Sequence, residues 1–358
     1  MSSTIQIIHD LFQIKGGGER LIQTLCEDTG ADLLTGHIGP DTFNLDHLEG
    51  SVENLSALSR IDGIKTWRLA QAFKQHKPTK SDYQHVIYSG VASPLAINHY
   101  PQAKNIFYCH TPPRFVYDKR THYAKELNFF KKIAFKALIN WFQPQYEAAV
   151  DKMDVVLTNS NYVKKRIHAS LGITAEVVYP PCDTQHFKWQ QAGDFYLSLA
   201  RHDELKRVDQ IINAFKQLPD KKLVIASGGQ MTAALKQSAA GHDNISFTGW
   251  LSENELLQLI GSCLATIYIP VDEDFGMSPV ESMSAGKPVL CADHGGLLES
   301  VIDQETGFYI NNQDVENDLI QTINSLNRNQ AQAMRRACEA RALLFDTHIF
   351  LNKIKNYL

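Results

Sequence analysis

Short apolar runs alternate with longer amphipathic runs along nearly the whole chain, and this alternation limits the possible folds more than any other feature. The apolar runs predict strands at residues 5–8, 85–88, 105–108, 155–158, 195–200, 223–227, 245–247, 265–268 and 289–292. The amphipathic runs predict helices at residues 19–27, 66–73, 128–141, 163–170, 208–217, 253–262, 314–326 and 330–342. Strands that alternate with helices form parallel sheets covered by helices, so we expect an α/β fold.

The length of the chain favours two such sheets. Its 358 residues exceed what one core usually fills, and 44% hydrophobic residues are enough for two cores. The best boundary is the segment around Pro180 and Pro181, because two prolines impose an extended backbone and interrupt regular structure. We therefore expect doubly wound domains over residues 1–180 and 181–342. Such domains leave a cleft between the carboxyl ends of their strands, where these sheets bind ligands.

Composition excludes several classes of protein. The formal net charge of -4 gives no general attraction to nucleic acid. The six cysteines show neither Cys-x-x-Cys nor metal-finger spacing, which predicts reduced, mostly buried thiols in the cytoplasm. The first residues lack a basic region followed by a long apolar stretch, and no later run is long enough to span a bilayer. We expect neither a secretory leader nor an integral membrane protein.

Two carboxylates with seven residues between them, Glu273 and Glu281, give the clearest indication of chemistry. They follow an apolar run and lead into a predicted helix, residues 278–285, with a proline in its first turn. Backbone N–H groups at such a helix start attract an anion or a hydroxyl, and carboxylates accept hydrogen bonds from hydroxyls. A nucleotide sugar offers both kinds of group. Taken alone, the two glutamates could equally be solvated surface residues.

This segment resembles the Glu-x7-Glu motif of the retaining glycosyltransferases of family four, and residues 292–301 match the next segment of that family's sequences. The resemblance runs from about Gly16 to the C-terminus. It implies the GT-B fold: two Rossmann-like, doubly wound domains that face each other across a cleft, with a C-terminal helix, residues 343–358, that returns to the first domain. It also implies that Glu281 holds the ribose and that the donor sugar is bound by Glu273, Asp274, Phe275, Gly276 and Met277.

Positive charge for a diphosphate is available at Arg201, just past a predicted strand, and at Lys206 before a helix. The family has a matching Arg-x4-Lys, which implies that both residues stabilise charge on the leaving nucleoside diphosphate. Asp272 and Asp274 fit the Asp-x-Asp pattern by which another glycosyltransferase fold holds a metal. Because this pattern lies inside the Glu-x7-Glu segment, we expect no required metal and no cofactor.

The N-terminal half carries two further motifs. The glycines after Lys15 open the first predicted helix, but they satisfy neither a Rossmann fingerprint nor a Walker loop. Family members have Gly-Gly here, over the donor phosphate and the acceptor, which implies this place for Gly16 and Gly17 and makes them donor-binding candidates. The segment from Tyr108 resembles Tyr-x-His-Thr-Pro-x-Arg of bacterial mannosyl- and rhamnosyltransferases that build lipopolysaccharide or capsule. It implies that His110 contacts the donor sugar; an isolated histidine here would more often be a buried imidazole. Arg114 is a candidate for binding a phosphate or hydroxyl of the acceptor.

Residues 244–256 predict a strand, a turn and a helix whose Ser252 and Glu255 have capping-box spacing. Family relatives place the nucleotide base at this turn, so Gly249 and Trp250 are candidates for binding the base. Trp250 could equally be surface packing.

The predicted helix at residues 128–141 could meet a membrane. Lys125, Lys132 and Lys136 share one face at helical spacing, flanked by the aromatic residues Phe129, Phe130 and Trp141. An ordinary domain helix with lysines facing water explains the pattern equally well.

Together these motifs predict a retaining hexosyltransferase that uses a nucleoside diphosphate sugar and a glycan or lipid-linked acceptor in cell-surface polysaccharide synthesis. GDP-mannose is the preferred donor on the His-Thr-Pro-Pro-Arg resemblance; UDP-glucose, UDP-galactose and GDP-rhamnose stay open. The alternatives are a sugar-nucleotide epimerase or a phosphorylase on the same fold, and a non-catalytic subunit of a glycosyltransferase complex. The expected location is the cytoplasm, with the inner face of the plasma membrane as an option.

Overall fold

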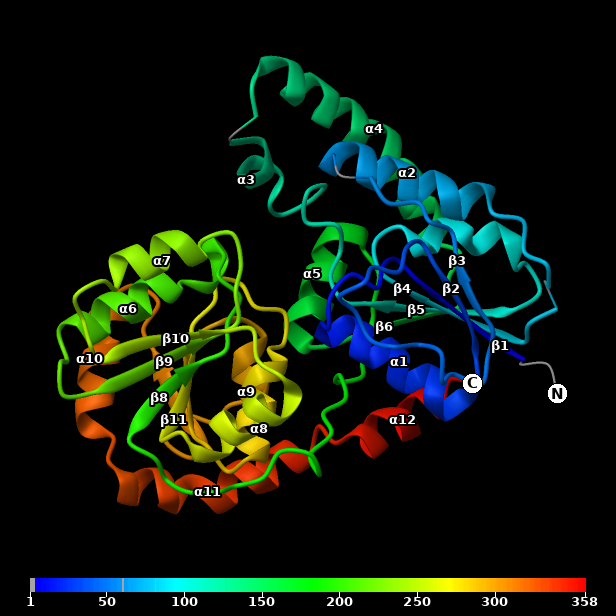
Figure 1. The fold of residues 1–358 in the computed structure, drawn as a ribbon. Helices are drawn as coiled ribbons and strands as arrows, with labels where there is room; N and C mark the ends of the chain where they lie inside the picture. Colours follow the sequence, from blue (N-terminus) through cyan, green and yellow to red (C-terminus); the bar gives the residue numbers. More distant parts are fainter. Residues whose placement is uncertain (1–3, 60, 81, 126) are drawn as a thin grey trace. The chain divides into compact units, whose positions relative to one another are not determined.

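The computed structural model describes residues 4–59, 61–80, 82–125 and 127–358 and divides into two compact units (Figure 1). The first unit is Met1–Tyr179 with Leu351–Leu358, and the second is Pro180–Phe350. The chain thus leaves the first unit within the two-proline segment. The expectation about a leader rests partly on residues 1–3, which lie outside the described residues.

The first unit is built on a parallel sheet of seven strands, in the order β3-β2-β1-β4-β5-β6-β7. Every neighbouring pair is parallel, as the alternation of strands and helices requires. Its strands are β1 (Ile5–His9), β2 (Asp32–Thr35), β3 (Val52–Asn54), β4 (His85–Ser89), β5 (Lys104–Cys109), β6 (Val155–Thr158) and β7 (Glu176–Val177).

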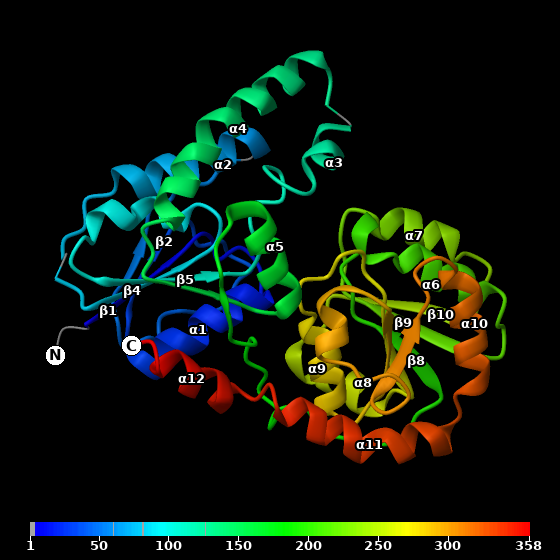
Figure 2. The ribbon, with the colours of Figure 1, turned by 180° about the vertical axis from the view of Figure 1, so that it is seen from behind.

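Helices cover both faces of this sheet: Figures 1 and 2 show α1 on one face and α2 with α4 on the other. The side chain of Ser160 caps α5, and Asn128 caps α4 by accepting from the Lys131 N–H. Phe107, Phe142 and Tyr146 are fully buried in the core between the sheet and α4. The helices are α1 (Gly17–Thr29), α2 (Asp62–Gln75), η1 (Ser93–His99), α3 (Arg120–Lys125), α4 (Phe129–Val150) and α5 (Asn161–Leu171).

The second unit has a parallel sheet of six strands in the order β10-β9-β8-β11-β12-β13. The predicted capping box of Ser252 and Glu255 is confirmed at the start of α8. The strands are β8 (Phe195–Ser198), β9 (Lys222–Ala226), β10 (Ile245–Gly249), β11 (Ala265–Tyr268), β12 (Val289–Ala292) and β13 (Gly307–Ile310). The helices are η2 (Glu204–Lys206), α6 (Val208–Lys216), α7 (Thr232–Ser238), α8 (Glu253–Ser262), α9 (Met277–Ser284), η3 (Gly295–Glu299), α10 (Val315–Ser325) and α11 (Arg328–Leu343). The last helix, α12 (Thr347–Lys355), begins in the second unit and ends in the first.

All nine predicted strands are present, and four strands were not predicted: β2, β3, β7 and β13. Two of them carry little apolar signal, since β3 is exposed along its length and β7 has only two residues. The final helix, α12, begins at Thr347 rather than at residue 343, because α11 continues to Leu343. Lys355, the last residue of α12, pairs with Asp28 at 2.9 Å.

The strand order changes direction once in each sheet. In the first unit β1 lies between β2 and β4, and in the second β8 lies between β9 and β11. At such a switch point the loops leave the strand ends in opposite directions and open a crevice, which is where doubly wound sheets bind ligands. The loops after β1 and β4, and those after β8 and β11, are therefore the places to look for a site.

Candidate active site

Beyond the switch point of the second unit, three side chains form one hydrogen-bonded cluster. The Lys206 Nζ donates to Glu273 Oε2 at 2.6 Å and to the Tyr268 hydroxyl at 2.9 Å, and that hydroxyl donates to the same Oε2 at 2.9 Å. Lys206 comes from the loop after β8, while Tyr268 ends β11 and Glu273 lies in the loop after it. The side chains of Lys206 and Glu273 are 16% and 18% exposed, so the pair is partly shielded yet open to a ligand.

Tyr268 was not predicted as a site residue. Burial first, and then the charge of Glu273, raise the pKa of Tyr268 well above its usual range, which keeps its hydroxyl protonated as a donor. The only signal in the sequence was its place at the end of a predicted strand, five residues before Glu273.

The loop that carries Glu273 is held against the turn at Gly295 and Gly296. The Gly296 N–H donates to the Glu273 carbonyl at 2.9 Å. A Cβ on Gly295 would lie 2.7 Å from that carbonyl oxygen, and one on Gly296 would lie 2.1 Å from the Asp274 carbonyl oxygen. Any side chain at either position would displace this loop, which gives the Gly-Gly pair of this segment a physical reason.

The rest of the Glu-x7-Glu segment surrounds the start of α9. Gly276 has φ +85° and precedes the first residue of that helix, Met277. The Phe275 side chain is buried and packs edge-on against Phe345, with ring centroids 5.3 Å apart. Only the backbone of Phe275 is therefore left to face a ligand. Glu281 lies on α9 and is partly buried.

Arg201 and its neighbour Arg207 differ sharply in environment. The Arg201 side chain is 59% exposed, with Asp203 3.7 Å away, and its charge acts on the pKa of Tyr268. Arg207 is buried; its Nε donates to the Ile269 carbonyl at 2.7 Å and its Nη1 to Asn312 at 2.6 Å. Arg207 therefore ties the end of β11 to the Lys206 loop, a positioning role that was not predicted.

Gly249 and Trp250 stand at the end of β10. Gly249 has φ +73° and ends that strand at a register shift. The Trp250 ring is 74% exposed and lies over Gly228, where a Cβ would approach its Nε1 to 2.8 Å. The exposed ring face offers a flat apolar surface beside the carboxyl ends of β9 and β10.

Asp272 and Asp274, the residues of the Asp-x-Asp pattern, lie on either side of Glu273. Asp272 has φ +54°, and its N–H donates to His294 Nε2 at 3.2 Å. Within the described ranges, no three His, Cys, Asp or Glu side chains gather as a metal site would require.

In the first unit, the glycine loop and His110 lie side by side. Gly16 precedes α1, whose first residue is Gly17. A Cβ on Gly18 would lie 3.7 Å from His110 Cε1, an ordinary contact distance. The structure thus places the loop after β1 next to the residue that comes directly after β5.

His110 belongs to a hydrogen-bonded chain with Ser89 and His9. The Ser89 Oγ is 2.8 Å from His110 Nε2 and 3.0 Å from His9 Nδ1, and the same Nδ1 is 3.1 Å from the Ser89 carbonyl oxygen. Burial lowers the pKa of His110 to about 4. Burial, followed by the influence of His110, lowers the pKa of His9 to about 3, so both imidazoles are neutral near neutral pH.

Arg114 is engaged within its own loop. Its Nη2 donates to Asp118 at 2.7 Å, and Arg166 lies 3.7 Å from the same carboxylate. Arg166 also donates to the Thr111 hydroxyl at 2.8 Å and so supports the segment after His110. Binding of an acceptor by Arg114 stays a prediction.

Residues 129–134, at the start of α4, are all exposed. Phe129, Phe130 and Ile133 are 71%, 79% and 55% exposed. The prediction that Lys125 shares a face with Lys132 was wrong, because Lys125 ends α3 and Asn128 caps a separate helix. Among the helices that the structure describes, none combines the length and apolar character needed to cross a bilayer.

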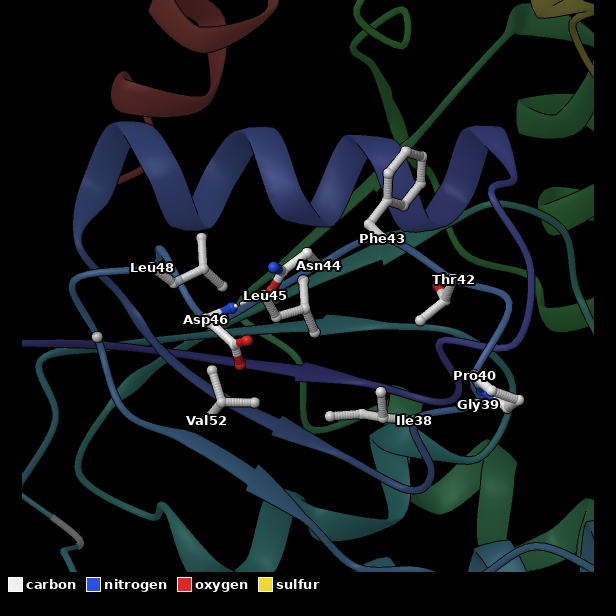
Figure 3. A pocket seen from close by; sticks show the side chains of 11 residues that line it. Ile38, Gly39, Pro40, Thr42, Phe43, Asn44, Leu45, Asp46, Leu48 and Val52 are labelled. Atoms are coloured by element: carbon white, nitrogen blue, oxygen red, sulfur yellow. Dashed lines mark hydrogen bonds between the residues drawn. The ribbon is translucent and has the colours of Figure 1, made fainter. Parts of the chain in front are cut away.

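A hollow of about 620 Å³ lies in the loop between β2 and β3 (Figure 3). Its apolar lining residues include Ile38, Pro40, Leu45 and Val52. The Arg20 guanidinium of α1 lies over the Phe43 ring at the rim, 5.4 Å from its centroid. None of the predicted site residues lines this hollow.

The comparisons with known proteins identify the class. Residues 183–343 match the family described as Glycosyl transferases group 1, so the second unit carries a domain of that family. Sucrose-phosphate synthase from Thermosynechococcus elongatus has a similar structure, with a TM-score of 0.80, 16% identity and 98% of each chain covered. Anabaena HepE in complex with UDP-glucose gives a TM-score of 0.73 at 17% identity, also over 98% of each chain. The chain therefore has the GT-B fold.

Comparison with individual proteins gives more specific similarities than the family match. The chain is 26% identical over 260 residues to the Alpha-1,3/1,6-mannosyltransferase ALG2 of Dictyostelium discoideum, covering 59% of each chain. It is 27% identical over 241 residues to the human protein of the same name, covering 57% of this chain and 55% of that one. The matches thus span little more than half the length of these relatives. WaaG, a glycosyltransferase involved in lipopolysaccharide biosynthesis, shares the fold with a TM-score of 0.73 at 12% identity, over 98% of each chain.

Proposed function

We propose that this protein is a retaining glycosyltransferase that moves a mannosyl group from GDP-mannose to a glycan or a lipid-linked glycan. The observation that carries the proposal is the 2.6 Å contact between Lys206 and Glu273 at a switch point of the group 1 domain. The family resemblance assigns Lys206 to the diphosphate and Glu273 to the donor sugar. A nucleotide sugar contains both of these groups in one molecule. The His-Thr-Pro-Pro-Arg segment and the name of the ALG2 relatives support mannose.

In the proposed reaction the bond between the sugar C1 and the diphosphate oxygen breaks, and a bond from C1 to the acceptor hydroxyl oxygen forms on the same face. The acceptor proton passes to the departing diphosphate. Lys206 and Arg201 stabilise the charge that develops on that leaving group. Lys206 then exchanges part of its contact with Glu273 for the diphosphate, while the Tyr268 hydroxyl keeps the carboxylate oriented toward the sugar hydroxyls.

A UDP-hexose is the second candidate donor. The observation that favours it is the complex of the structurally similar HepE with UDP-glucose. The base-side candidates Gly249 and Trp250 offer a backbone turn and an apolar ring face, which suit either base.

The purified protein should be incubated with GDP-mannose, GDP-rhamnose, UDP-glucose or UDP-galactose, each with mannose-terminated glycans free or lipid-linked. We expect transfer from GDP-mannose, and NMR of the product should show the α configuration of the donor. A product of inverted configuration would contradict retention. Turnover without an acceptor would favour an epimerase, dependence on inorganic phosphate a phosphorylase, and binding without turnover a non-catalytic subunit.

We also propose that the start of α4 attaches the protein to an anionic membrane surface, at the inner face of the plasma membrane. At about 100° per residue, Phe129, Ile133 and Phe130 fall in one sector of this helix. Lys132 and Lys136 border one edge of that sector and Lys131 lies beyond the other, an arrangement that suits insertion of apolar groups between acidic headgroups.

Vesicles of phosphatidylcholine alone and with phosphatidylglycerol test this attachment by co-sedimentation. We expect binding only to the anionic vesicles, and its loss in the double variants Phe129→Ser with Phe130→Ser and Lys132→Glu with Lys136→Glu. The control is Leu343→Ser, which removes a leucine of the second unit that is 50% exposed. Equal binding by the wild type and the phenylalanine variant would refute the attachment.

A further inference from the structure

The contacts around Ser89 determine more than the position of His110. A backbone carbonyl can only accept a hydrogen bond, so the 3.1 Å contact from His9 Nδ1 to the Ser89 carbonyl oxygen requires a proton on that nitrogen. The same Nδ1–H reaches the Ser89 Oγ at 3.0 Å. The Ser89 hydroxyl therefore serves as an acceptor toward His9, and its own proton is available for a different partner.

That partner is His110 Nε2, 2.8 Å from the Ser89 Oγ. If the hydroxyl donates, Nε2 must be the unprotonated nitrogen of His110. A neutral imidazole carries one proton, which then resides on Nδ1. Burial lowers the pKa of both imidazoles, to about 3 for His9 and about 4 for His110, which agrees with two neutral rings.

The position of Ser89 in this hydrogen-bonded chain of side chains is fixed by burial and by Asp10. Ser89 is fully buried, and the backbone after it is clamped by Asp10, whose carboxylate accepts from the Val91 N–H at 2.7 Å and the Ser93 N–H at 2.7 Å. The Asp10 N–H donates to the Ser89 carbonyl at 3.1 Å. Because β1 and β4 are neighbours at the switch point, this arrangement fixes the Ser89 hydroxyl between two strands.

The other nitrogen of His110 is differently placed. The His110 Nδ1 has no hydrogen-bond partner among the described residues. It does not belong to the buried side-chain atoms that lack a partner, so it is accessible. His110 also lies beside Gly18 of the glycine loop. A proton on Nδ1 is thus presented where a ligand at the switch point of this sheet can accept it.

We propose that Ser89 and His9 are positioning residues that fix His110 as its Nδ1–H tautomer, so that His110 acts as a hydrogen-bond donor to an oxygen of the donor sugar and not as a base. The proposal rests on the proposed function for the identity of the ligand. It adds the direction of the hydrogen bond and the two residues that set it.

The first test reads the tautomer without substrate. Two-bond proton–nitrogen correlation spectra of protein labelled with ¹⁵N-histidine distinguish the two neutral tautomers, and His110→Asn identifies the signals of that ring. We expect the Nδ1–H form in the wild type and appearance of the Nε2–H form in Ser89→Ala. The matched control is Thr35→Val, at the end of the neighbouring strand, because the buried Thr35 hydroxyl has no partner in the described chain. An Nε2–H or charged His110 in the wild type would overturn the proposal.

The second test reads catalysis with the donor that proves active. The amide nitrogen of asparagine superimposes on histidine Nδ1, whereas that of glutamine superimposes on Nε2. His110→Asn should therefore retain a higher kcat than His110→Gln, and Ser89→Ala should lower kcat about tenfold, the scale of one neutral hydrogen bond. His110→Gln more active than His110→Asn would contradict the assigned direction. Absence of transfer with every donor would refute the proposed function, while the spectra would still decide the tautomer.

Discussion

The hydrogen-bonded cluster beyond the switch point of the second unit contains an ion pair, whereas the cluster around His110 in the first unit is uncharged. Lys206 and Glu273 form a partly shielded ion pair, and His110 belongs to a chain of two uncharged imidazoles and a hydroxyl. Both sets lie after strands at the same topological position of a doubly wound sheet. One topology thus supports two kinds of chemistry, and the side chains at the strand ends decide which.

The difference matters for a nucleotide sugar. A departing diphosphate gains negative charge, so it needs cations that act over a distance. A sugar hydroxyl is neutral, so it is best recognised by a hydrogen bond of fixed direction. Cations are therefore suited to stabilise the departing diphosphate. A neutral histidine with a fixed tautomer is suited to recognise a sugar hydroxyl.

The largest effect is expected from removing the charge of the second unit. Lys206→Ala should lower kcat by roughly 10²–10³, because it removes a donor at the developing charge. Steady-state kinetics with the active donor measure it. The matched control is Lys222→Ala, which breaks an exposed ion pair with Asp194 at the amino end of β9 and should leave kcat near the wild-type value. Equal losses in both variants would mean a general effect on folding.

Glu273→Gln should lower kcat by a similar factor, because the lost charge is that of the carboxylate that we propose to bind the sugar. Its affinity for GDP should change far less, because the assigned contact is to the sugar. Calorimetric titration with GDP separates the two effects. A variant that loses GDP affinity and turnover in equal measure would place Glu273 at the diphosphate.

A smaller effect is expected for Tyr268→Phe. This change removes the hydroxyl that donates to Glu273 and accepts from Lys206, and it leaves the ring in its buried place. We expect kcat to fall about tenfold, the cost of one hydrogen bond that orients the carboxylate. Unchanged kinetics would show that the ion pair alone fixes the geometry.

The neutral histidines of the first unit predict a dependence of stability on pH. The pKa values of His110, about 4, and His9, about 3, lie below the 6.5 of an ordinary histidine. Between these values the unfolded chain binds more protons than the folded one, so stability is complete above pH 6.5 and declines as the pH falls. From about pH 7.5 to about pH 5.5 each histidine should cost on the order of 1 kcal/mol.

Urea denaturation at the two pH values measures this loss, and His9→Asn should reduce it because asparagine does not titrate. The variant retains an amide donor near Nδ1 and so keeps the hydrogen bond to Ser89. A wild-type protein whose unfolding free energy is the same at both pH values would show that the histidines are protonated in the folded state.

The smallest expected effect is that of a chelator. Lys206 and Arg201 supply positive charge, so we predict that EDTA leaves transfer unchanged. Atomic absorption of the purified protein serves as a control for a tightly held ion. Loss of activity with EDTA that Mg²⁺ or Mn²⁺ restores would assign a metal to Asp272 and Asp274 and show that the positive charge of the second unit does not come from Lys206 and Arg201 alone.

The sequence alone was enough for the α/β class, the nine strands with strong apolar runs, and the residues of the Glu-x7-Glu and Arg-x4-Lys motifs. These features are local, because strand periodicity, helix capping and motif spacing are all expressed within a few residues. The capping box at Ser252 shows this well, since its two partners are only three residues apart. The short strands β3 and β7 were not predicted, because pairing with a neighbouring strand, and not their own composition, makes them strands.

Tertiary structure decided which distant residues meet. Tyr268 joins Lys206 because β8 and β11 are neighbours, although 62 residues separate the two side chains in sequence. Ser89 reaches His9 across 80 residues because β4 pairs with β1. Strand order depends on how the whole chain packs, and no local pattern encodes it. For that reason the sequence predicted candidate site residues such as Lys206, Glu273 and His110, while their neighbours Tyr268 and Ser89 emerged only from the fold.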